Sequence, residues 1–335
     1  MSARGAKVEP PLMAITGAGG FIGLRMAEQA RERGYAVRGL ELDVRAAARA
    51  SAAGAEVLVG DVGDGEAVRR LCESASVIFH TAAIVDEGGD WARFRRVNVE
   101  GTRHVASVAR DLGVERFVHL SSVMVYGFDY PRLVTEEGPL RGEKNPYCQT
   151  KIESEEALGE LHQPGRFETL VIRPGDVYGP ASVPWVVRPA ELMRRGLFML
   201  IDGGRGIMNH VYVDNLIDGI FLALDKNATG QAFTLTDGGE TTFREYFTRL
   251  GRLVGRDRLP SIPAPIAKLL FTLMAPVERM LGRKPLAEPS AVRFVTRRHP
   301  YSIAKARSVL GYEPRVTLDE GFRRVAEWLA SSAAR

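Results

Sequence analysis

Tyr147 stands four residues ahead of Lys151 in the stretch NPYCQTKIESEEAL. The residues after it are rich in Glu, Ala and Leu and predict a helix, on which side chains four apart share one face. A cation close to a phenol favours the phenolate, which can exchange a proton with a substrate hydroxyl or carbonyl. Taken alone, this spacing is more typical of a surface pair, so its meaning depends on the elements around it.

Two serines, Ser121 and Ser122, end an apolar run, RFVHLSS (116–122), that predicts a strand. In a doubly wound sheet, ligands bind at the carboxyl ends of the strands. The helix that begins at Tyr147 follows this strand, and we expect its first turn to return to the same edge. A serine hydroxyl, a phenol and an ammonium group would then converge at that edge.

The elements that must position these groups alternate along the first half of the chain. Nearly continuous apolar runs predict strands buried on both faces of a parallel sheet, with helical patterns between them. This alternation predicts an α/β fold with a Rossmann-like doubly wound parallel sheet. The predicted strands are 12–16, 36–40, 55–60, 76–80, 116–122 and 168–173.

A glycine-rich turn, TGAGGFIG, directly follows the first predicted strand, and its glycines Gly17, Gly20 and Gly23 are spaced G-x-x-G-x-x-G. Glycine lets the backbone turn sharply and approach a pyrophosphate, while the N-terminus of the next helix offers free N–H groups. The strand–turn–helix context argues against accidental glycines. The sequence therefore predicts a dinucleotide site at this turn.

Carboxylates after the second and third strands bear on the choice of cofactor. Glu41, with Asp43 close behind, can accept hydrogen bonds from both ribose hydroxyls and would repel a 2′-phosphate, which favours NAD over NADP. Arg45 lies near enough in the sequence to keep NADP open. Asp61 stands where a carboxylate could bind the adenine amino group, and a role as a turn residue is nearly as well supported.

The composition limits the class of protein. The chain has 335 residues, a net charge of +4 and two cysteines, Cys72 and Cys148. The cysteines lack metal-ligand spacing, so we expect no metal site and a reducing, cytoplasmic location. No basic run is interleaved with aromatic residues as in nucleic-acid binding, and no apolar run has the length of a membrane span.

The pattern changes after about residue 174, where Pro and Gly multiply and segments shorten. Residues 1–11 are expected to form a flexible leader, because they hold basic residues without the apolar stretch of a signal peptide. Residues 12–175 are expected to form the dinucleotide-binding domain, to which some later segments return. Residues 176–335 are expected to form mainly a smaller, partly helical substrate domain over the carboxyl edge of the sheet.

The sequence resembles the extended short-chain dehydrogenases/reductases, the NAD-dependent epimerase/dehydratase family, over nearly its whole length. Its matching motifs occur in the family's order and spacing. They are TGAGGFIG (16–23), GD (60–61), HTAA (80–83), Asn98 in VNVEGT, SSVMVYG (121–127), YCQTK (147–151), RPGDVYGP (173–180), NHVYVDNL (209–216) and LGYEP (310–314).

This resemblance implies roles for particular residues. Tyr147 would be the catalytic acid/base, and Lys151 would hold the nicotinamide ribose and lower the tyrosine pKa. Ser122 would bond the substrate oxygen, with Ser121 as the alternative, whereas Cys148 would pack inside the fold. The implied cofactor-binding residues, among which Asn98 is expected to be structural, are Gly17, Gly20, Phe21, Ile22, Glu41, Asp61, Val62, Thr81, Ala82, Ala83, Asn98, Tyr147, Lys151 and Pro174.

Two acidic features bear on the substrate class. Nucleotide-sugar enzymes of this family often carry Asn in the position of Asp176, and a carboxylate there repels a diphosphate. The loop VDEGGDW adds Asp86, Glu87 and Asp90, which also disfavour an anion. All of these could equally be solvated loop carboxylates. The expected substrate residues are Asp86, Ser122, Val123, Asp176 and Val177.

The stretch IPAPIAKLLFTLMAPVERML is apolar at helical spacing, with polar residues on the other side. Core packing is the default interpretation, and a lid or membrane-surface face near an apolar substrate is the sharper one. Together with RPGDVYGP, this insertion resembles the 3β-hydroxysteroid and sterol-4α-carboxylate 3-dehydrogenase branch of the family. The apolar residues are Ile266, Leu269, Leu270, Leu273, Met274, Val277 and Leu281.

We therefore expect an NAD(P)-dependent dehydrogenase that interconverts a secondary alcohol and a ketone on a bulky, apolar, 3β-hydroxysteroid-like molecule. A nucleotide-sugar 4-epimerase or dehydratase is the alternative. A non-catalytic NAD-sensing regulator is a further one, although such proteins often lose the Tyr–Lys pair that this chain keeps. Family members commonly pair through the helices of the 91–111 and 147–161 regions, so we expect a homodimer, with peripheral membrane contact by residues 266–281 as a further expectation.

Overall fold

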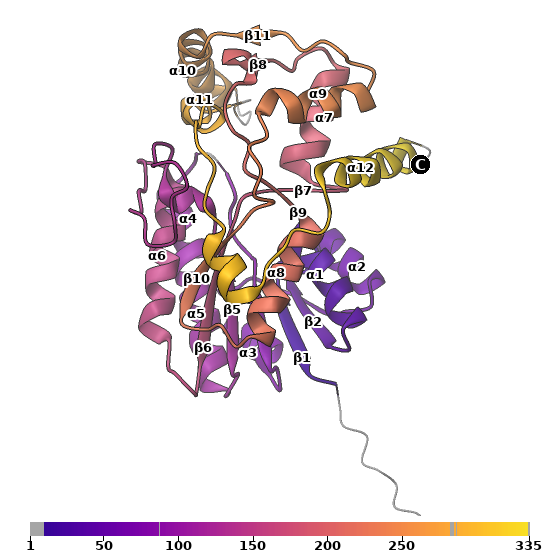
Figure 1. The fold of residues 1–335 in the computed structure, drawn as a ribbon. Helices are drawn as coiled ribbons and strands as arrows, with labels where there is room; N and C mark the ends of the chain where they lie inside the picture. Colours follow the sequence, from indigo (N-terminus) through magenta and orange to yellow (C-terminus); the bar gives the residue numbers. More distant parts are fainter. Residues whose placement is uncertain (1–9, 87, 282–284, 286, 334–335) are drawn as a thin grey trace, which may run out of the picture.

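Seven parallel strands form one sheet in a computed structural model, which describes residues 10–86, 88–281, 285 and 287–333. The strand order is β10-β6-β5-β4-β1-β2-β3, so the direction of winding reverses between β1 and β4 (Figure 1). Such a reversal opens a crevice at the carboxyl edge of the sheet. The strands are β1 (Leu12–Thr16), β2 (Ala36–Glu41), β3 (Glu56–Val59), β4 (Val77–His80), β5 (Arg116–Leu120), β6 (Glu168–Pro174) and β10 (Gln231–Leu235).

Helices cover both faces of the sheet, and two separate clusters of buried apolar residues hold them there. All four residues of β4 are buried, as expected for a central strand covered on both sides. The helices of this part are α1 (Phe21–Glu32), α2 (Val44–Ala52), α3 (Gly65–Cys72), α4 (Trp91–Phe94), the π-helical η1 (Arg95–Glu100), α5 (Gly101–Asp111), α6 (Pro146–Leu161) and α8 (Val213–Asp225), with the short 3-10 helix η2 (Val123–Tyr126) after β5.

Most of the remaining elements of the second half lie beyond the carboxyl edge of the sheet, whereas η5 packs beside the sheet against α8 and β10 (Figure 1). They include two small parallel sheets, β7 with β9 and β8 with β11. Their bounds are β7 (Asp176–Tyr178), η3 (Val183–Val187), α7 (Arg188–Arg194), β8 (Leu200–Ile201), η4 (Asp202–Gly204), β9 (His210–Tyr212), α9 (Phe243–Leu253), β11 (Ser261–Ile262), α10 (Ala264–Met280), α11 (Pro289–Val295), η5 (Ala306–Leu310) and α12 (Leu318–Ala333).

The predicted α/β fold is confirmed, and the six predicted strands match β1 to β6 to within two residues at each end. The seventh strand, β10, comes from beyond residue 176 and pairs with β6 in register Phe233↔Ile172. The second half of the chain therefore completes the sheet as well as covering its edge. Most of the predicted leader, residues 1–9, lies outside the described residues.

Core packing, the default interpretation of the apolar stretch in α10, is wrong. Only two of its residues, the small Ala267 and Ala275, are buried. The seven apolar residues that the periodicity assigned to a core face are all exposed, from 37% for Leu270 to 63% for Leu273. Periodicity finds an apolar face, but it does not say which way that face points. Among the described residues, no helix has the length and apolar character needed to cross a membrane.

Candidate active site

The first turn of α6 carries Tyr147 to the carboxyl edge of the sheet. Asn145 caps this helix, because its side-chain oxygen accepts hydrogen bonds from the backbone N–H groups of Tyr147 (2.9 Å) and Cys148 (3.1 Å). Pro146 occupies the first helical position, where its fixed φ suits a helix start. The sequence NPY thus fixes the start of the helix at the residue before the phenol. Cys148 is buried, as expected.

Ser122 is the second residue after β5 and caps η2. The backbone N–H of Met124 donates to its oxygen at 3.1 Å, which leaves the hydroxyl proton free to donate elsewhere. A hydrogen bond from Ser122 lowers the pKa of Tyr147, so these two side chains are brought together. The alternative, Ser121, instead donates to Glu155, which also forms a buried ion pair with Arg173. The geometry therefore favours Ser122 over Ser121 as the serine that acts with the phenol.

Lys151 lies one turn after Tyr147 and is only 3% exposed. Its Nζ donates to the backbone oxygen of Leu120 at 2.7 Å and lies 5.9 Å from the centre of the Tyr147 ring. Burial lowers the pKa of Lys151 to about 8, against an opposing effect of Glu155. Serine, phenol and amine thus converge at the end of β5, as the sequence predicted.

The expected electrostatic effect of Lys151 on the phenol is not the dominant one in the protein alone. Burial raises the pKa of Tyr147 to about 12, and the hydrogen bond from Ser122 offsets part of that rise. The phenol is therefore protonated at neutral pH and is set up as a proton donor. A positive nicotinamide ring beside it would favour the phenolate needed as a base.

The glycine-rich turn fits the close approach of a pyrophosphate. Gly17 has φ +68°, a left-handed conformation that favours glycine. A Cβ added to Gly19 would lie 2.1 Å from the backbone oxygen of Ala46, and one added to Gly23 would lie 2.2 Å from that of Gly17. Gly20 caps α1 without a side-chain hydrogen bond, so the backbone of the first turn is open to a ligand. Phe21 and Ile22 follow in that turn and are partly buried.

Glu41 lies at the end of β2, beside this turn. Its carboxylate accepts hydrogen bonds from the backbone N–H groups of Gly19 (2.9 Å) and Leu42 (3.0 Å). This position suits an acceptor for ribose hydroxyls next to the pyrophosphate site. Asp61 is exposed and accepts from the Gly63 N–H at 2.7 Å, which is turn geometry that leaves its second oxygen available. Val62 beside it is buried.

No role was predicted from the sequence for His80, whose ring links Thr16 at the end of β1 to Thr102 of α5. Its Nδ1 lies 2.9 Å from the Thr16 hydroxyl, and its Nε2 lies 2.9 Å from that of Thr102. Thr102 donates to the Asn98 carbonyl, so it must accept from His80, and Thr16 must donate to the other nitrogen. Burial lowers the pKa of His80 to about 3, which keeps the ring neutral in that single tautomer.

Thr16 also accepts hydrogen bonds from the N–H groups of Thr81 and Ala82, both at 3.2 Å, and so holds the loop after β4. Asn98 holds the same loop farther on, because its side chain accepts from the Ile84 N–H at 2.7 Å and donates to the Ile84 carbonyl. Asn98 is 1% exposed, which agrees with the structural role expected of it. Two more predicted residues, Ala83 in this loop and the buried Pro174 at the end of β6, lie at the same edge.

The environment of Asp176 weakens the argument that its charge excludes a diphosphate substrate. It is buried, and its carboxylate accepts from Arg297 at 2.7 Å and from the Asn209 N–H at 3.0 Å. Because Arg297 neutralises this carboxylate, its charge does not by itself repel a diphosphate. Val123 and Val177 are buried and belong to apolar clusters, so their side chains pack inside the protein.

Of the loop carboxylates, Asp86 is partly buried after β4, and Asp90 caps α4 by accepting from the Ala92 N–H at 3.0 Å. Glu87 lies outside the described residues. Among the described residues, no cluster of His, Cys, Asp and Glu is placed to hold a metal ion.

A cavity of about 260 Å³ lies between residues 128–130, which follow η2, and residues 293–299 at and after the end of α11. Its lining combines aromatic and cationic side chains and does not include Ser122, Tyr147 or Lys151. One lining residue, Arg293, forms an ion pair with Glu143, which lies on the segment that leads into α6 and Tyr147. The lining residues are Phe128, Asp129, Tyr130, Arg293, Thr296, Arg298 and His299.

Comparison with known proteins agrees with this arrangement. Residues 13–235 match the family described as "NAD dependent epimerase/dehydratase family". A 4-hydroxy-2-methyl-3-oxo-4-farnesyl-3,4-dihydroquinoline-1-oxide ketoreductase of Stigmatella aurantiaca is 31% identical, covering 92% of this chain and 93% of the relative. A 3-beta-hydroxysteroid dehydrogenase of Mycolicibacterium neoaurum is 32% identical, covering 91% of this chain and 88% of the relative.

The solved structure of UDP-glucose 4-epimerase from Thermotoga maritima is similar in fold. It superposes with a TM-score of 0.78 at 23% identity, covering 96% of this chain and 99% of that one. At this identity, the likeness concerns the fold alone.

Proposed function

Because the chain belongs to the NAD-dependent epimerase/dehydratase family and is an NAD-dependent oxidoreductase of the extended short-chain type, we propose that it interconverts a secondary alcohol and a ketone on a bulky apolar molecule. The observation that carries this proposal is the convergence of Ser122, Tyr147 and Lys151 at the end of β5. A 3β-hydroxysteroid is the leading substrate class.

The proton steps follow from the contacts of these three side chains. In ketone reduction, the Tyr147 phenol gives its proton to the substrate oxygen. The single hydroxyl proton of Ser122 is directed at the phenol in the protein alone, and it would turn to the substrate oxygen, and so orient it, when a substrate is bound. In alcohol oxidation the same groups act in reverse. Lys151 contributes its charge beneath the phenol ring. Bound NAD supplies the hydride acceptor or, when reduced, the hydride donor.

The substrate class is supported by the names of two relatives. One is a ketoreductase of a farnesylated dihydroquinoline oxide and the other is a 3-beta-hydroxysteroid dehydrogenase. Both names describe a keto or hydroxyl group on an apolar ring system. In this chain the reacting groups lie among buried apolar residues, with Val123, Tyr126 and Ile152 in one cluster next to Ser122 and α6. An apolar ring system suits such surroundings.

NAD rather than NADP is favoured by Glu41. Its carboxylate is fixed by two backbone N–H groups next to the glycine-rich turn, where it can accept from the ribose hydroxyls. A 2′-phosphate in the same place would meet a negative charge. Arg49 lies close by, but its guanidinium donates to the Gly19 carbonyl at 3.1 Å and so has a structural partner already.

A homodimer remains part of the proposal. Helices α5 and α6 lie next to each other, linked by ion pairs such as Arg103–Glu160. Their outer faces could pair with those of a second copy to form a four-helix interface. Light scattering coupled to size-exclusion chromatography tests this directly, since a monomer at micromolar concentration would contradict it.

A substrate screen tests the proposed activity. The protein is offered NAD and NADP separately, with 3β-hydroxysteroids, simple secondary alcohols, and UDP- or dTDP-sugars, while the absorbance of reduced nicotinamide is followed. We expect NAD reduction with a hydroxysteroid, and a loss of about 10²–10⁴-fold in Tyr147→Phe. Tyr35→Phe is the matched control, because Tyr35 packs against Phe221 away from the site.

Two other outcomes would redirect the assignment. Epimerised sugar product or tight UDP-sugar binding, without turnover of hydroxysteroids, would favour the nucleotide-sugar enzymes. Tight NAD binding with no turnover of any substrate class would favour a sensing role, against the retained Tyr147–Lys151 pair.

A further inference from the structure

Helix α10 presents its large apolar side chains to the outside of the protein. Met280 is 81% exposed, Leu273 63% and Leu269 61%. Soluble proteins rarely leave a continuous apolar patch of this kind without a use for it. The complete set is Ile266, Leu269, Leu270, Leu273, Met274, Val277, Met280 and Leu281, which we call the α10 apolar face.

The α10 apolar face is one continuous stripe. Its members follow the i, i+3, i+4, i+7 spacing of a single helix face. The buried residues Ala267 and Ala275 lie on the other side, where the helix rests on the protein. Apart from the partly buried Phe271, only these two small side chains anchor the helix, so its leucines and methionines project outward.

The charges around this stripe are mainly positive. Lys268 and Arg279 are exposed on the polar side of the helix, where Arg279 forms an ion pair with Glu288. Arg283 and Lys284 follow the helix in the sequence, outside the described residues. Between positions 264 and 288 the sequence has four basic residues and two acidic ones, Glu278 and Glu288. No carboxylate interrupts the apolar face itself. Apolar residues on one face with flanking Lys and Arg are typical of helices that lie in a membrane interface.

We propose that α10 docks the protein on the surface of an anionic lipid membrane. The α10 apolar face would enter the boundary between head groups and acyl chains, and Lys268 would be the cation that reaches the phosphates. Two copies of this chain meeting through the same face would instead bring their cations together. An anionic lipid surface therefore complements this helix better than a second copy does.

The docked helix would stand beside the catalytic edge. α10 packs on α11, whose Arg293 is paired with Glu143 on the segment leading to Tyr147. The connection between the two helices also reaches the loop after β4, because a Cβ added to Gly88 would lie 3.1 Å from the Glu288 side chain. An apolar substrate dissolved in the membrane would then be close to the site, a consequence that rests on the proposed function.

Vesicle flotation tests the docking without any substrate, so its outcome does not depend on the proposed activity. The full chain is mixed with vesicles of phosphatidylcholine alone or of phosphatidylcholine with phosphatidylglycerol. We expect flotation with the anionic vesicles, weakened by salt, and a fall of about tenfold or more in the partition coefficient for Leu269→Glu/Leu273→Glu. Val309→Glu is the matched control, because Val309 is 43% exposed on η5, outside the α10 apolar face.

Lys268→Glu tests the electrostatic attraction to anionic lipid separately from the insertion of the apolar face. It should weaken binding to anionic vesicles and leave any residual binding to neutral ones unchanged. Equal flotation of the wild type and the double variant would overturn the proposal. So would a wild-type dimer that ignores vesicles and becomes monomeric in the double variant, since the α10 apolar face would then be an interface between copies. All four substituted side chains are exposed, so folding should be preserved.

Discussion

The amine of Lys151 and the phenol of Tyr147 are coupled in position, with the nitrogen 5.9 Å from the ring centre, yet burial drives their pKa values in opposite directions. The pKa of the amine falls to about 8 and that of the phenol rises to about 12. Over a wide range of pH the phenol therefore keeps its proton, whereas the charge beneath it is lost within the range of ordinary assays.

The pH dependence of ketone reduction follows from these directions. The acid, Tyr147, stays protonated as pH rises through 8, but Lys151 loses its proton above a pKa of about 8. We expect kcat/KM for reduction to be level below neutrality and to decline above about pH 8. Steady-state kinetics with intrinsic fluorescence as a check on folding would measure it. A level profile through that pH would mean that Lys151 does not act through its charge.

The two neighbouring serines provide a matched pair of substitutions. Ser122→Ala removes the donor to Tyr147 and should lower kcat by about 10²-fold. Ser121→Ala removes the hydrogen bond to Glu155 beside the Arg173 ion pair, so it should lower stability and leave kcat nearly unchanged. Kinetics and thermal unfolding on both variants separate the effects. The same loss of kcat in both would contradict the assignment of Ser122.

Glu41→Gln tests the basis of cofactor selection. The amide keeps an oxygen that can accept the Gly19 N–H, but the negative charge that opposes a 2′-phosphate is gone. We expect the ratio of kcat/KM for NADP to that for NAD to rise by about tenfold or more. Asp43→Asn serves as the control, because Asp43 caps α2 by accepting from the Ala46 N–H. An unchanged ratio in Glu41→Gln would exclude Glu41 as the selecting group.

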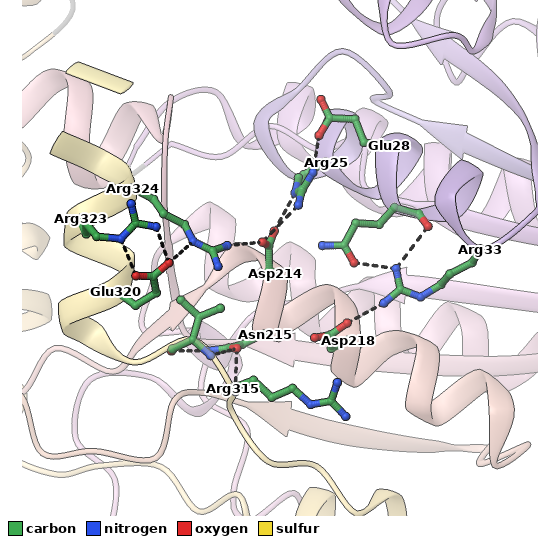
Figure 2. Close-up of polar contacts among 12 residues, drawn as sticks. Arg25, Glu28, Arg33, Asp214, Asn215, Asp218, Arg315, Glu320, Arg323 and Arg324 are labelled. Carbon is green, nitrogen blue, oxygen red and sulfur yellow. Dashed lines mark hydrogen bonds and ion pairs between the residues drawn. The ribbon is translucent and has the colours of Figure 1, made fainter. Parts of the chain in front are cut away.

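Asp214 ties the C-terminal helix to the helix of the glycine-rich turn (Figure 2). Its carboxylate pairs with Arg25 of α1 at 2.7 Å and with Arg324 of α12 at 3.0 Å, and its side chain is 13% exposed. Asp214→Asn removes the negative charge and one of the two acceptor oxygens that the arginines share, and should lower the free energy of unfolding by about 1–2 kcal/mol.

A second carboxylate on α8 is the control for this prediction. Asp218 pairs with Arg33 at 2.6 Å, but its side chain is 31% exposed (Figure 2). Asp218→Asn should therefore cost less than about 1 kcal/mol. Urea unfolding of both variants gives the comparison. Equal losses would mean that burial of Asp214 between two helices adds nothing.

Much of the fold could be predicted from the sequence because strands buried on both faces are almost continuously apolar. The same pattern placed Ser122, Tyr147 and the glycine-rich turn at one edge, since parallel strands share their carboxyl ends. The family was also identified correctly from the order of its motifs. These features depend on local sequence and on the topology that strand–helix alternation imposes.

Long-range partners were beyond such reasoning. Arg297 neutralises Asp176 across 121 positions, and Thr16 meets His80 across 64, so no local spacing announces either contact. The same limit applied to α10. Its apolar face could be predicted from the spacing, but whether that face points to the core or to the outside depends on what the helix packs against. The pKa of Tyr147 likewise depends on burial, which the sequence indicated only indirectly.

Strand β10 has a consequence for how the protein is made. It supplies the last neighbour of β6, and Thr234 near its end hydrogen-bonds to Tyr126 and to Glu136. While the ribosome is still synthesising residues 175–230, β6 presents an open edge to other nascent chains. The sheet is therefore complete only after β10 has been made, and we expect chaperones that shield strand edges to matter most in that interval.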